Sequence, residues 1–351
     1  MATKPMRIGV IGYGYWGPNL VRNLMELPGA DLIAVADLKC ERLAWIGTVY
    51  PKVIATQDYR SLYDLDLDGV VIATPPPTHH PIAQDMLNHG LSVLVEKPLA
   101  LKSEHAEELI KLAEEKGQVL MVGHTFVYNP AVTALKELIS SGELGELRYL
   151  DAARLSLGLY QHDLNVLWDL APHDISIILH LLGEDPVSVR ATGASCIQGS
   201  VEDVVYITFQ FPSGLMAHIH VSWLDPCKVR RVTVVGSRKM VVYNDVAPNE
   251  KLRIYDKGVE CPPYTDSFAG FQYAYRYGDI IIPNIQFTEP LRLECAHFVD
   301  CMAHGKRPIT DGYNGLKVVE IIEAAQRSLR NGGALEEIDY VMAARSVMEA
   351  V

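Results

Sequence analysis

The stretch Ile8-Gly9-Val10-Ile11-Gly12-Tyr13-Gly14-Tyr15-Trp16-Gly17 decides the fold of this chain. Residues 8–11 predict a strand, and residues 18–27 predict a helix directly after it. The glycines between them have the spacing of a strand-to-helix turn. Gly12 permits the tight turn, Gly14 lets the backbone approach a pyrophosphate, and Gly17 lets the helix pack closely. The helix start adds N–H groups for the phosphates, so the segment predicts a dinucleotide site.

A second apolar run, residues 31–36, ends in Asp37. Its carboxylate can accept hydrogen bonds from the 2′- and 3′-hydroxyls of a ribose and would repel a 2′-phosphate. The sequence therefore favours NAD over NADP as cofactor. The alternative is a glycine-rich turn that binds nothing, but strand, helix, second strand and terminal Asp are all in place.

Composition excludes several classes of protein. The 351 residues suit two domains, and a net charge of −12 argues against a broad nucleic-acid-binding face. The six cysteines form no CxxC pair and have no histidine at zinc spacing, so we expect reduced thiols and no metal site. With no signal peptide and no long apolar span, we expect a cytoplasmic protein that does not contact a membrane.

The chain divides by pattern into two halves. Short apolar runs alternate with helical stretches up to residue 125, which predicts a doubly wound parallel sheet, the Rossmann arrangement. Later strands are longer and alternate in polarity, which predicts a large, mostly antiparallel open sheet in an α+β domain. We assign residues 1–125 to the first domain and 126–351 to the second, whose last helix is able to pack back on the first. Residues 261–283, with Tyr264, Tyr273, Tyr275 and Tyr277, are expected to be irregular. They form either a packed loop or a segment that lines the active site or an oligomer contact.

Glu96-Lys97-Pro98 follows a buried apolar run, residues 92–95. Ligands of open parallel sheets bind outside the carboxyl ends of the strands, so Glu96 and Lys97 are expected at the cofactor. A lysine there can exchange a proton with a hydroxyl or carbonyl, although most lysines after a strand are merely solvated. A cis bond before Pro98 would be one way to aim Lys97.

A stiff loop, Thr74-Pro75-Pro76-Pro77-Thr78-His79, follows another predicted strand. Its three prolines suit it to lie along a cofactor, with Thr74, Pro76 and His79 as contacts. We expect Thr74 and His79 to bind the nicotinamide ribose. The alternative is a loop that is only structural.

Trp168-Asp169-Leu170-Ala171-Pro172-His173 opens a helix near residues 171–182. If both Asp169 and His173 are helical, they share one face. His173 could then exchange a proton with a substrate hydroxyl while Asp169 positions the sugar or the lysine. Taken singly, such an Asp is most often a helix cap and such a His is most often structural.

Together, the glycine fingerprint, Glu96-Lys97-Pro98 and Asp169-x-x-x-His173 resemble the Gfo/Idh/MocA family of NAD(P)-dependent sugar oxidoreductases. The resemblance covers nearly the whole chain and implies a Rossmann domain followed by an α+β domain whose sheet often forms an oligomer contact. It implies Lys97 and His173 as the catalytic pair, with Asp169 as the associated carboxylate. It also places Tyr15 and Trp16 at the cofactor and Tyr128, Asn129 and Trp168 at the substrate.

Within that family, residues 168–174 and 275–280 are similar to the branch that acts on nucleotide-linked sugars, such as UDP-N-acetylglucosamine 3-dehydrogenases. This resemblance implies oxidation of a ring hydroxyl, at C3, with hydride transfer to NAD and with Lys97 and His173 as the acid–base pair. It also implies a homo-oligomer, a dimer or a tetramer.

Two other functions fit the same residues. A dehydrogenase of free polyols or sugars, of the myo-inositol or glucose type, would use the same catalytic trio with a different pocket. A non-catalytic NAD-binding sensor would keep the Rossmann domain, but the presence of Lys97 with Asp169 and His173 argues against it.

Overall fold

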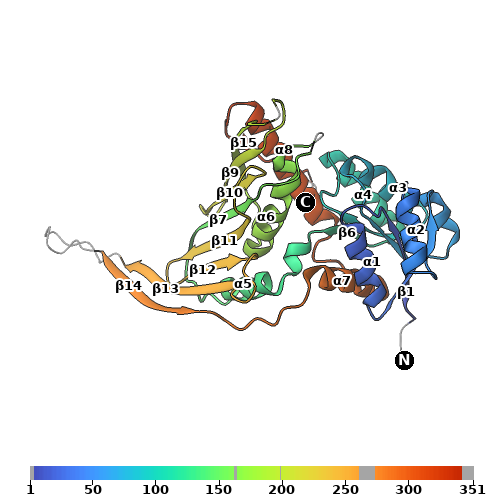
Figure 1. Cartoon of the computed structure of the whole chain (residues 1–351). Coiled ribbons are helices and arrows are strands. Elements are labelled where there is room, and N and C mark those ends of the chain that lie inside the picture. Colours follow the sequence, from blue (N-terminus) through green and yellow to red (C-terminus); the bar gives the residue numbers. More distant parts are fainter. Residues whose placement is uncertain (1–3, 162–163, 198, 261–272, 342–351) are drawn as a thin grey trace, which may run out of the picture. The chain divides into compact units, whose positions relative to one another are not determined.

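The computed structural model describes residues 4–161, 164–197, 199–260 and 273–341 (Figure 1). It divides into two compact units. The first consists of Met1–Tyr128 and Thr288–Glu323, and the second consists of Asn129–Phe287 and Ala324–Val351. Each unit is built around one sheet.

The first unit contains, among its described residues, a six-stranded sheet in the order β3-β2-β1-β4-β5-β6, here called the parallel sheet. Every neighbouring pair in it is parallel. The order reverses between β1 and β4, and open sheets bind ligands outside the carboxyl ends of the strands at this reversal. The strands are β1 (Met6–Ile11), β2 (Ala30–Ala36), β3 (Ile54–Thr56), β4 (Gly69–Ile72), β5 (Ser92–Glu96) and β6 (Leu120–Gly123).

Helices pack around this sheet. Helix α1 contacts β1 and β2, while α3 contacts β4 and β5; right-handed crossovers on either side of β1 put such helices on opposite faces. The predicted Rossmann arrangement is confirmed. The helices are α1 (Gly17–Glu26), α2 (Cys40–Val49), α3 (His79–Asn88), α4 (Ser103–Lys116), α7 (Pro290–His304) and the first part of α8 (Gly312–Arg330), with short 3₁₀ turns η1 (Tyr59–Asp64), η2 (Pro76–Thr78) and η3 (Thr125–Tyr128).

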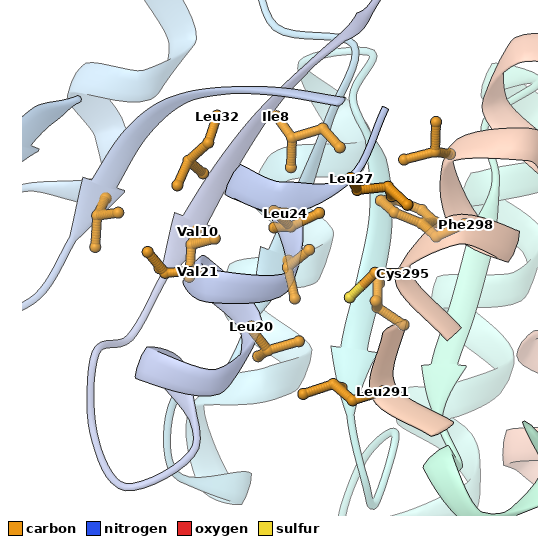
Figure 2. Close-up of a cluster of buried hydrophobic side chains, with 14 of the residues drawn as sticks. Ile8, Val10, Leu20, Val21, Leu24, Leu27, Leu32, Leu291, Cys295 and Phe298 are labelled. Carbon is orange, nitrogen blue, oxygen red and sulfur yellow. The ribbon is translucent and has the colours of Figure 1, made fainter. Parts of the chain in front are cut away.

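The core between α1, α7 and β1 explains why these helices form. Figure 2 shows Leu20 and Leu24 of α1 facing the strand on one side and α7 on the other. Helix α7 contributes Leu291, Cys295 and Phe298, which recur at a spacing of three or four residues and so lie on one face. Burying a side chain such as Phe298 stabilises the fold by about 1.5–3 kcal/mol.

The sequence analysis placed everything after residue 125 in the second domain, whereas the structure groups residues 288–323 with the first unit. The reason is a set of contacts with the parallel sheet. Helix α7 packs on α1 and η3. Thr310 accepts the amide of Val122 at its carbonyl and donates its hydroxyl to the Val122 carbonyl, at 2.8 Å each.

The second unit contains, in the part that the structure describes, a nine-stranded sheet in the order β14-β13-β12-β11-β7-β10-β9-β8-β15, here called the mixed sheet. Its pairs are antiparallel except β7 with β10. Helix α6 packs on β7, β9 and β10, and α5 packs on β12 and α6 (Figure 1). The elements are α5 (Pro130–Ser140), β7 (Leu147–Leu155), α6 (Val166–Leu182), β8 (Ser188–Ala194), β9 (Val204–Gln210), β10 (Met216–Ser222), β11 (Val229–Gly236), β12 (Met240–Asn244), β13 (Leu252–Glu260), β14 (Ala274–Ile281) and β15 (Glu336–Glu337).

The predicted open, mostly antiparallel sheet is confirmed, with two local differences. Residues 274–281, expected to be irregular, form β14, because they pair with β13 along its length; Tyr264 lies outside the described residues. Helix α6 begins at Val166 rather than near Ala171, because Asn165 caps it and Pro172 is accommodated inside it.

No helix in the described ranges combines the length and the apolar character that crossing a membrane requires.

Candidate functional site

The glycine loop after β1 has the backbone that its sequence predicts. Gly12 has φ +99°, and a Cβ there would meet the carbonyl oxygen of Ala73 at 2.5 Å. A Cβ on Gly17 would meet the carbonyl oxygen of Gly12 at 2.5 Å. Only glycine tolerates the positive φ at residue 12 and the lack of space for a Cβ at residues 12 and 17. These two glycines therefore set the turn and the close approach of α1.

Gly14 is different, because the protein itself does not require it. A Cβ there would have its nearest neighbour 3.8 Å away, on Arg42, so the space above it is open. No side chain among the described residues caps α1, so N–H groups at the start of this helix remain available. Tyr15 beside it is 87% exposed. An open glycine at an uncapped helix N-terminus fits the pyrophosphate of a dinucleotide.

Asp37 lies at the carboxyl end of β2, where a ribose was predicted. Its carboxylate accepts the amides of Tyr13 at 2.7 Å and Lys39 at 2.9 Å, and pairs with Arg42 at 3.0 Å. Burial opposes its ionisation, but these N–H groups outweigh burial and hold the pKa of Asp37 below its usual value. A fixed negative charge at this place suits ribose hydroxyls better than a 2′-phosphate. Arg42, which sequence reasoning missed, is the third residue of α2.

The loop after β4 runs past the glycine turn. A Cβ on Gly12 would lie 2.9 Å from the amide nitrogen of Thr74, and Pro76 opens η2. The His79 ring is buried, with Nδ1 2.8 Å from the Pro98 carbonyl and Nε2 2.8 Å from the Thr74 carbonyl. Both ring nitrogens therefore lie at backbone carbonyls. This favours a structural role for His79, in which it holds the loop in place, rather than the predicted contact with the ribose.

Glu96 is the last residue of β5, and Lys97 follows it at the carboxyl end of the parallel sheet. The Lys97–Pro98 peptide bond is cis, as the sequence suggested. Burial raises the pKa of Glu96 to about 7, although Lys97 beside it acts in the opposite direction. The fingerprint, Asp37, the Thr74 loop and the Glu96–Lys97 pair thus gather along one edge of the parallel sheet.

Tyr128 and Asn129, predicted at the substrate, are both buried. The Tyr128 hydroxyl lies 2.9 Å from the hydroxyl of Thr310. Asn129 caps α5, and its amide nitrogen donates to Tyr243 at 2.9 Å and to Asp245 at 3.1 Å. These bonds favour structural roles for both side chains.

Helix α6 carries Trp168, Asp169 and His173, all partly exposed. Asp169 and His173 are four residues apart within the helix, so they share a face. Asp174, on another face, is buried and bonded to Arg154 at 2.6 and 3.1 Å. That buried ion pair anchors the helix, while the face with Asp169 and His173 keeps access to solvent.

Sequence reasoning missed the residue that orients Asp169. Trp223, 1% exposed at the end of β10, donates its indole N–H to Oδ2 of Asp169 at 3.0 Å. It also missed Glu294 and His124, which are completely buried near Glu96. Glu294 could have been found, because it falls on the apolar face of α7 beside Cys295.

Two family models match most of the chain. The model described as an oxidoreductase family with an NAD-binding Rossmann fold matches residues 6–124, and the GFO/IDH/MocA C-terminal domain model matches residues 132–242. The first covers the glycine loop, Asp37 and Lys97; the second covers Asp169 and His173. The first unit therefore carries an NAD-binding Rossmann domain.

Individual relatives agree with the family models. The UDP-N-acetylglucosamine 3-dehydrogenase of Acidithiobacillus ferrooxidans is 30% identical over 264 residues, which cover 74% of this chain and 79% of that protein. The scyllo-inositol 2-dehydrogenase (NAD⁺) of Bacillus subtilis is 27% identical, covering 93% and 95%. The solved structure of the Acidithiobacillus enzyme matches with a TM-score of 0.79 and 24% identity over 94% of this chain and 99% of that one, which supports the fold. This chain is thus an NAD-dependent oxidoreductase and belongs to the Gfo/Idh/MocA family.

Proposed function

We propose that this protein oxidises a ring hydroxyl, at C3, of a nucleotide-linked sugar such as UDP-N-acetylglucosamine to a ketone. The relative from Acidithiobacillus, which is 30% identical, supports this substrate class. The order of the chemical groups along the chain, with Lys97 in the first unit and Asp169 and His173 in the second, supports the oxidation chemistry.

The observation that carries the proposal is the placement of these groups on rigid elements. Lys97 directly follows β5, whereas Asp169 and His173 lie on one face of α6. NAD, when bound, supplies the hydride acceptor. Lys97 takes or relays the proton of the reacting hydroxyl, and its positive charge stabilises the developing alkoxide.

In this proposal His173 is the second acid–base group of the reaction, and Asp169 orients the sugar. The Trp223 indole holds Asp169 at 3.0 Å, so the carboxylate is positioned before the substrate arrives. Proton transfer in such a preorganised site is more efficient than in a site whose groups must first become ordered.

A second candidate is the oxidation of a free polyol. Two relatives of this kind, the scyllo-inositol dehydrogenase of Bacillus subtilis and an inositol 2-dehydrogenase of Rhizobium meliloti, are 27% and 26% identical and cover 93% and 92% of this chain. The same acid–base groups serve both reactions, so the pocket around them decides the substrate.

The experiment that tests the proposal follows NADH absorbance with four substrates: UDP-N-acetylglucosamine, its uronic acid, myo-inositol and glucose. A recycling oxidant, 2-oxoglutarate, is included in a parallel series, because a tightly held cofactor would otherwise stop after one turnover. Turnover with the UDP-sugars alone supports the proposal. Turnover with inositol or glucose alone overturns the substrate class and leaves the catalytic groups in place.

We further propose that the protein is a homo-oligomer that associates through the outer face of the mixed sheet. Alternate residues on this face, such as Tyr206 and Met216, are exposed, and a recess of about 500 Å³ there is lined by Asp151, His218 and Arg231 among others. Light scattering tests this: Met216→Arg should shift the mass of an oligomer toward that of one chain, and a wild-type monomer would refute it.

A further inference from the structure

Two carboxyl groups come together behind the cofactor edge of the parallel sheet. Glu96 on β5 pairs in register with Gly123 on β6, and a Cβ on Gly123 would lie 3.1 Å from Oε2 of Glu96. The Glu96 side chain therefore lies across this strand end. Two residues further on, Thr125 donates its hydroxyl to Oε2 of Glu294 at 2.9 Å. The end of β6 and the start of η3 thus bring both carboxyl groups into one cluster.

The surroundings of the pair disfavour two negative charges. Glu294 is completely buried, and in the described part of the chain no hydrogen-bond partner reaches its Oε1. Burial, and then the charge of Glu96, raises the pKa of Glu294 well above its usual value. Buried carboxyl groups whose charges repel each other do not ionise together readily, so ionisation of one favours the protonated form of the other.

The other titratable groups that face the pair keep their charge near neutral pH. Burial, with Lys97, lowers the pKa of His124 to about 3, so its imidazole is neutral. Burial raises the pKa of the Cys295 thiol and of the Tyr128 phenol well above their usual values. Lys97 contributes a positive charge beside Glu96. In contrast to the His124 imidazole, the Cys295 thiol and the Tyr128 phenol, the carboxyl pair can therefore change its charge near neutral pH.

The pair also lies on the nicotinamide side of the cofactor site. Asp37 marks the adenosine ribose on β2, and the glycine loop marks the pyrophosphate beside β1. Because a dinucleotide crosses the reversal between β1 and β4, its other half extends toward β4 and β5. Glu96 ends β5 and is partly exposed there, with Glu294 behind it.

We propose that Glu96 and Glu294 form an acid pair that gives up a proton when NAD⁺ binds and keeps it when NADH binds. The oxidised nicotinamide carries a positive charge that favours an ionised carboxylate, and the reduced ring is uncharged. Alcohol oxidation yields a ketone, NADH and one proton, so the pair takes up this proton as the ring charge disappears. The inference rests on cofactor binding and is independent of which sugar is oxidised.

Calorimetry of cofactor binding tests the pair without any sugar. Near pH 7, the dependence of the binding enthalpy on buffer ionisation enthalpy gives the number of protons exchanged. We expect NAD⁺ to release a fraction of a proton and NADH to release less. NAD⁺ affinity should rise about fivefold from pH 6 to pH 8, the effect of lowering one pKa near 7 by one unit, and NADH affinity should stay nearly constant.

Isosteric variants assign the proton. Glu96→Gln should remove the difference between NAD⁺ and NADH, and Glu294→Gln, which removes the partner acid, should reduce it. Glu107→Gln is the matched control, because Glu107 is a buried carboxylate of the same unit paired with Lys111 on α4. Equal proton release with NAD⁺ and NADH in the wild type would overturn the proposal. So would a difference in proton release between the two cofactors that persists in both variants. A failure of the sugar proposal would change none of these measurements.

Discussion

The indole Nε1 of Trp223 donates a 3.0 Å hydrogen bond to Oδ2 of Asp169. Trp223 is buried and packs beside Tyr160, with ring centroids 5.6 Å apart. The carboxylate that faces solvent on α6 is therefore aimed by an aromatic side chain from the end of β10. A residue buried under a helix face can in this way control a group that acts on that face.

Trp223→Phe should lower kcat/KM for the sugar about tenfold and leave the KM for NAD⁺ near wild type. A hydrogen bond to a charged acceptor contributes about 1.5–3 kcal/mol, and part of it is lost as poorer orientation of Asp169. Steady-state kinetics measure both constants. Tyr160→Phe is the control, because among the described residues the Tyr160 hydroxyl has no hydrogen-bond partner. Equal losses in the two variants would mean that packing, not the indole N–H, is responsible.

Lys97→Met should lower turnover by about 10²–10⁴, the usual contribution of general acid–base catalysis. Binding of NADH, followed by its fluorescence, should change far less, since the glycine loop and Asp37 are intact. Lys102→Met removes an exposed lysine just before α4 and should behave as wild type. Turnover of Lys97→Met within a few-fold of wild type would refute its catalytic assignment.

Gly12→Ala and Gly14→Ala should separate folding from cofactor binding. At Gly12 a Cβ would clash with the Ala73 carbonyl, and the alanine would have to adopt a positive φ. We therefore expect Gly12→Ala to lose at least about 2 kcal/mol of stability. At Gly14 the added methyl group has room in the protein but occupies the space assigned to the pyrophosphate. Gly14→Ala should therefore keep its melting temperature without cofactor and bind NAD⁺ more than about tenfold more weakly. Calorimetry and thermal unfolding measure the two effects, and normal NAD⁺ affinity in Gly14→Ala would contradict the placement of the pyrophosphate.

The residues that the sequence predicted well are those whose roles depend on local spacing. Gly12, Gly17 and Asp37 act within one strand–helix–strand unit, and their neighbours in sequence are their neighbours in space. The same holds for the i, i+4 spacing of Asp169 and His173 within α6.

The residues that the sequence missed depend on contacts between distant segments. Glu294 meets Thr125 only because α7 returns to the parallel sheet, and no local pattern announces that return. The hydrogen bonds of Tyr128 and Asn129 could not be predicted for the same reason, since their partners Thr310 and Tyr243 come much later in the chain. The start of α6 was predicted too late in the chain, near Ala171. A proline inside a helix is rare, and Pro172 is tolerated here after a capped first turn.

His124 provides a test of how the protein responds to acid. Its folded-state pKa of about 3 lies below the usual imidazole pKa of 6.5 because burial disfavours the imidazolium. The unfolded chain therefore binds a proton that the folded chain does not, so the stability contributed by neutral His124 is full above pH 6.5 and is lost as the pH falls from there toward 3. Linkage puts the loss at about 2 kcal/mol between pH 7.5 and pH 5. His124→Phe keeps a planar ring and removes the titration, so urea unfolding should show it gaining about 2 kcal/mol on wild type over that interval. His89→Phe, which changes an exposed histidine of the same unit, should show no such gain; a parallel fall in wild type and His124→Phe would show that His124 does not carry the acid sensitivity.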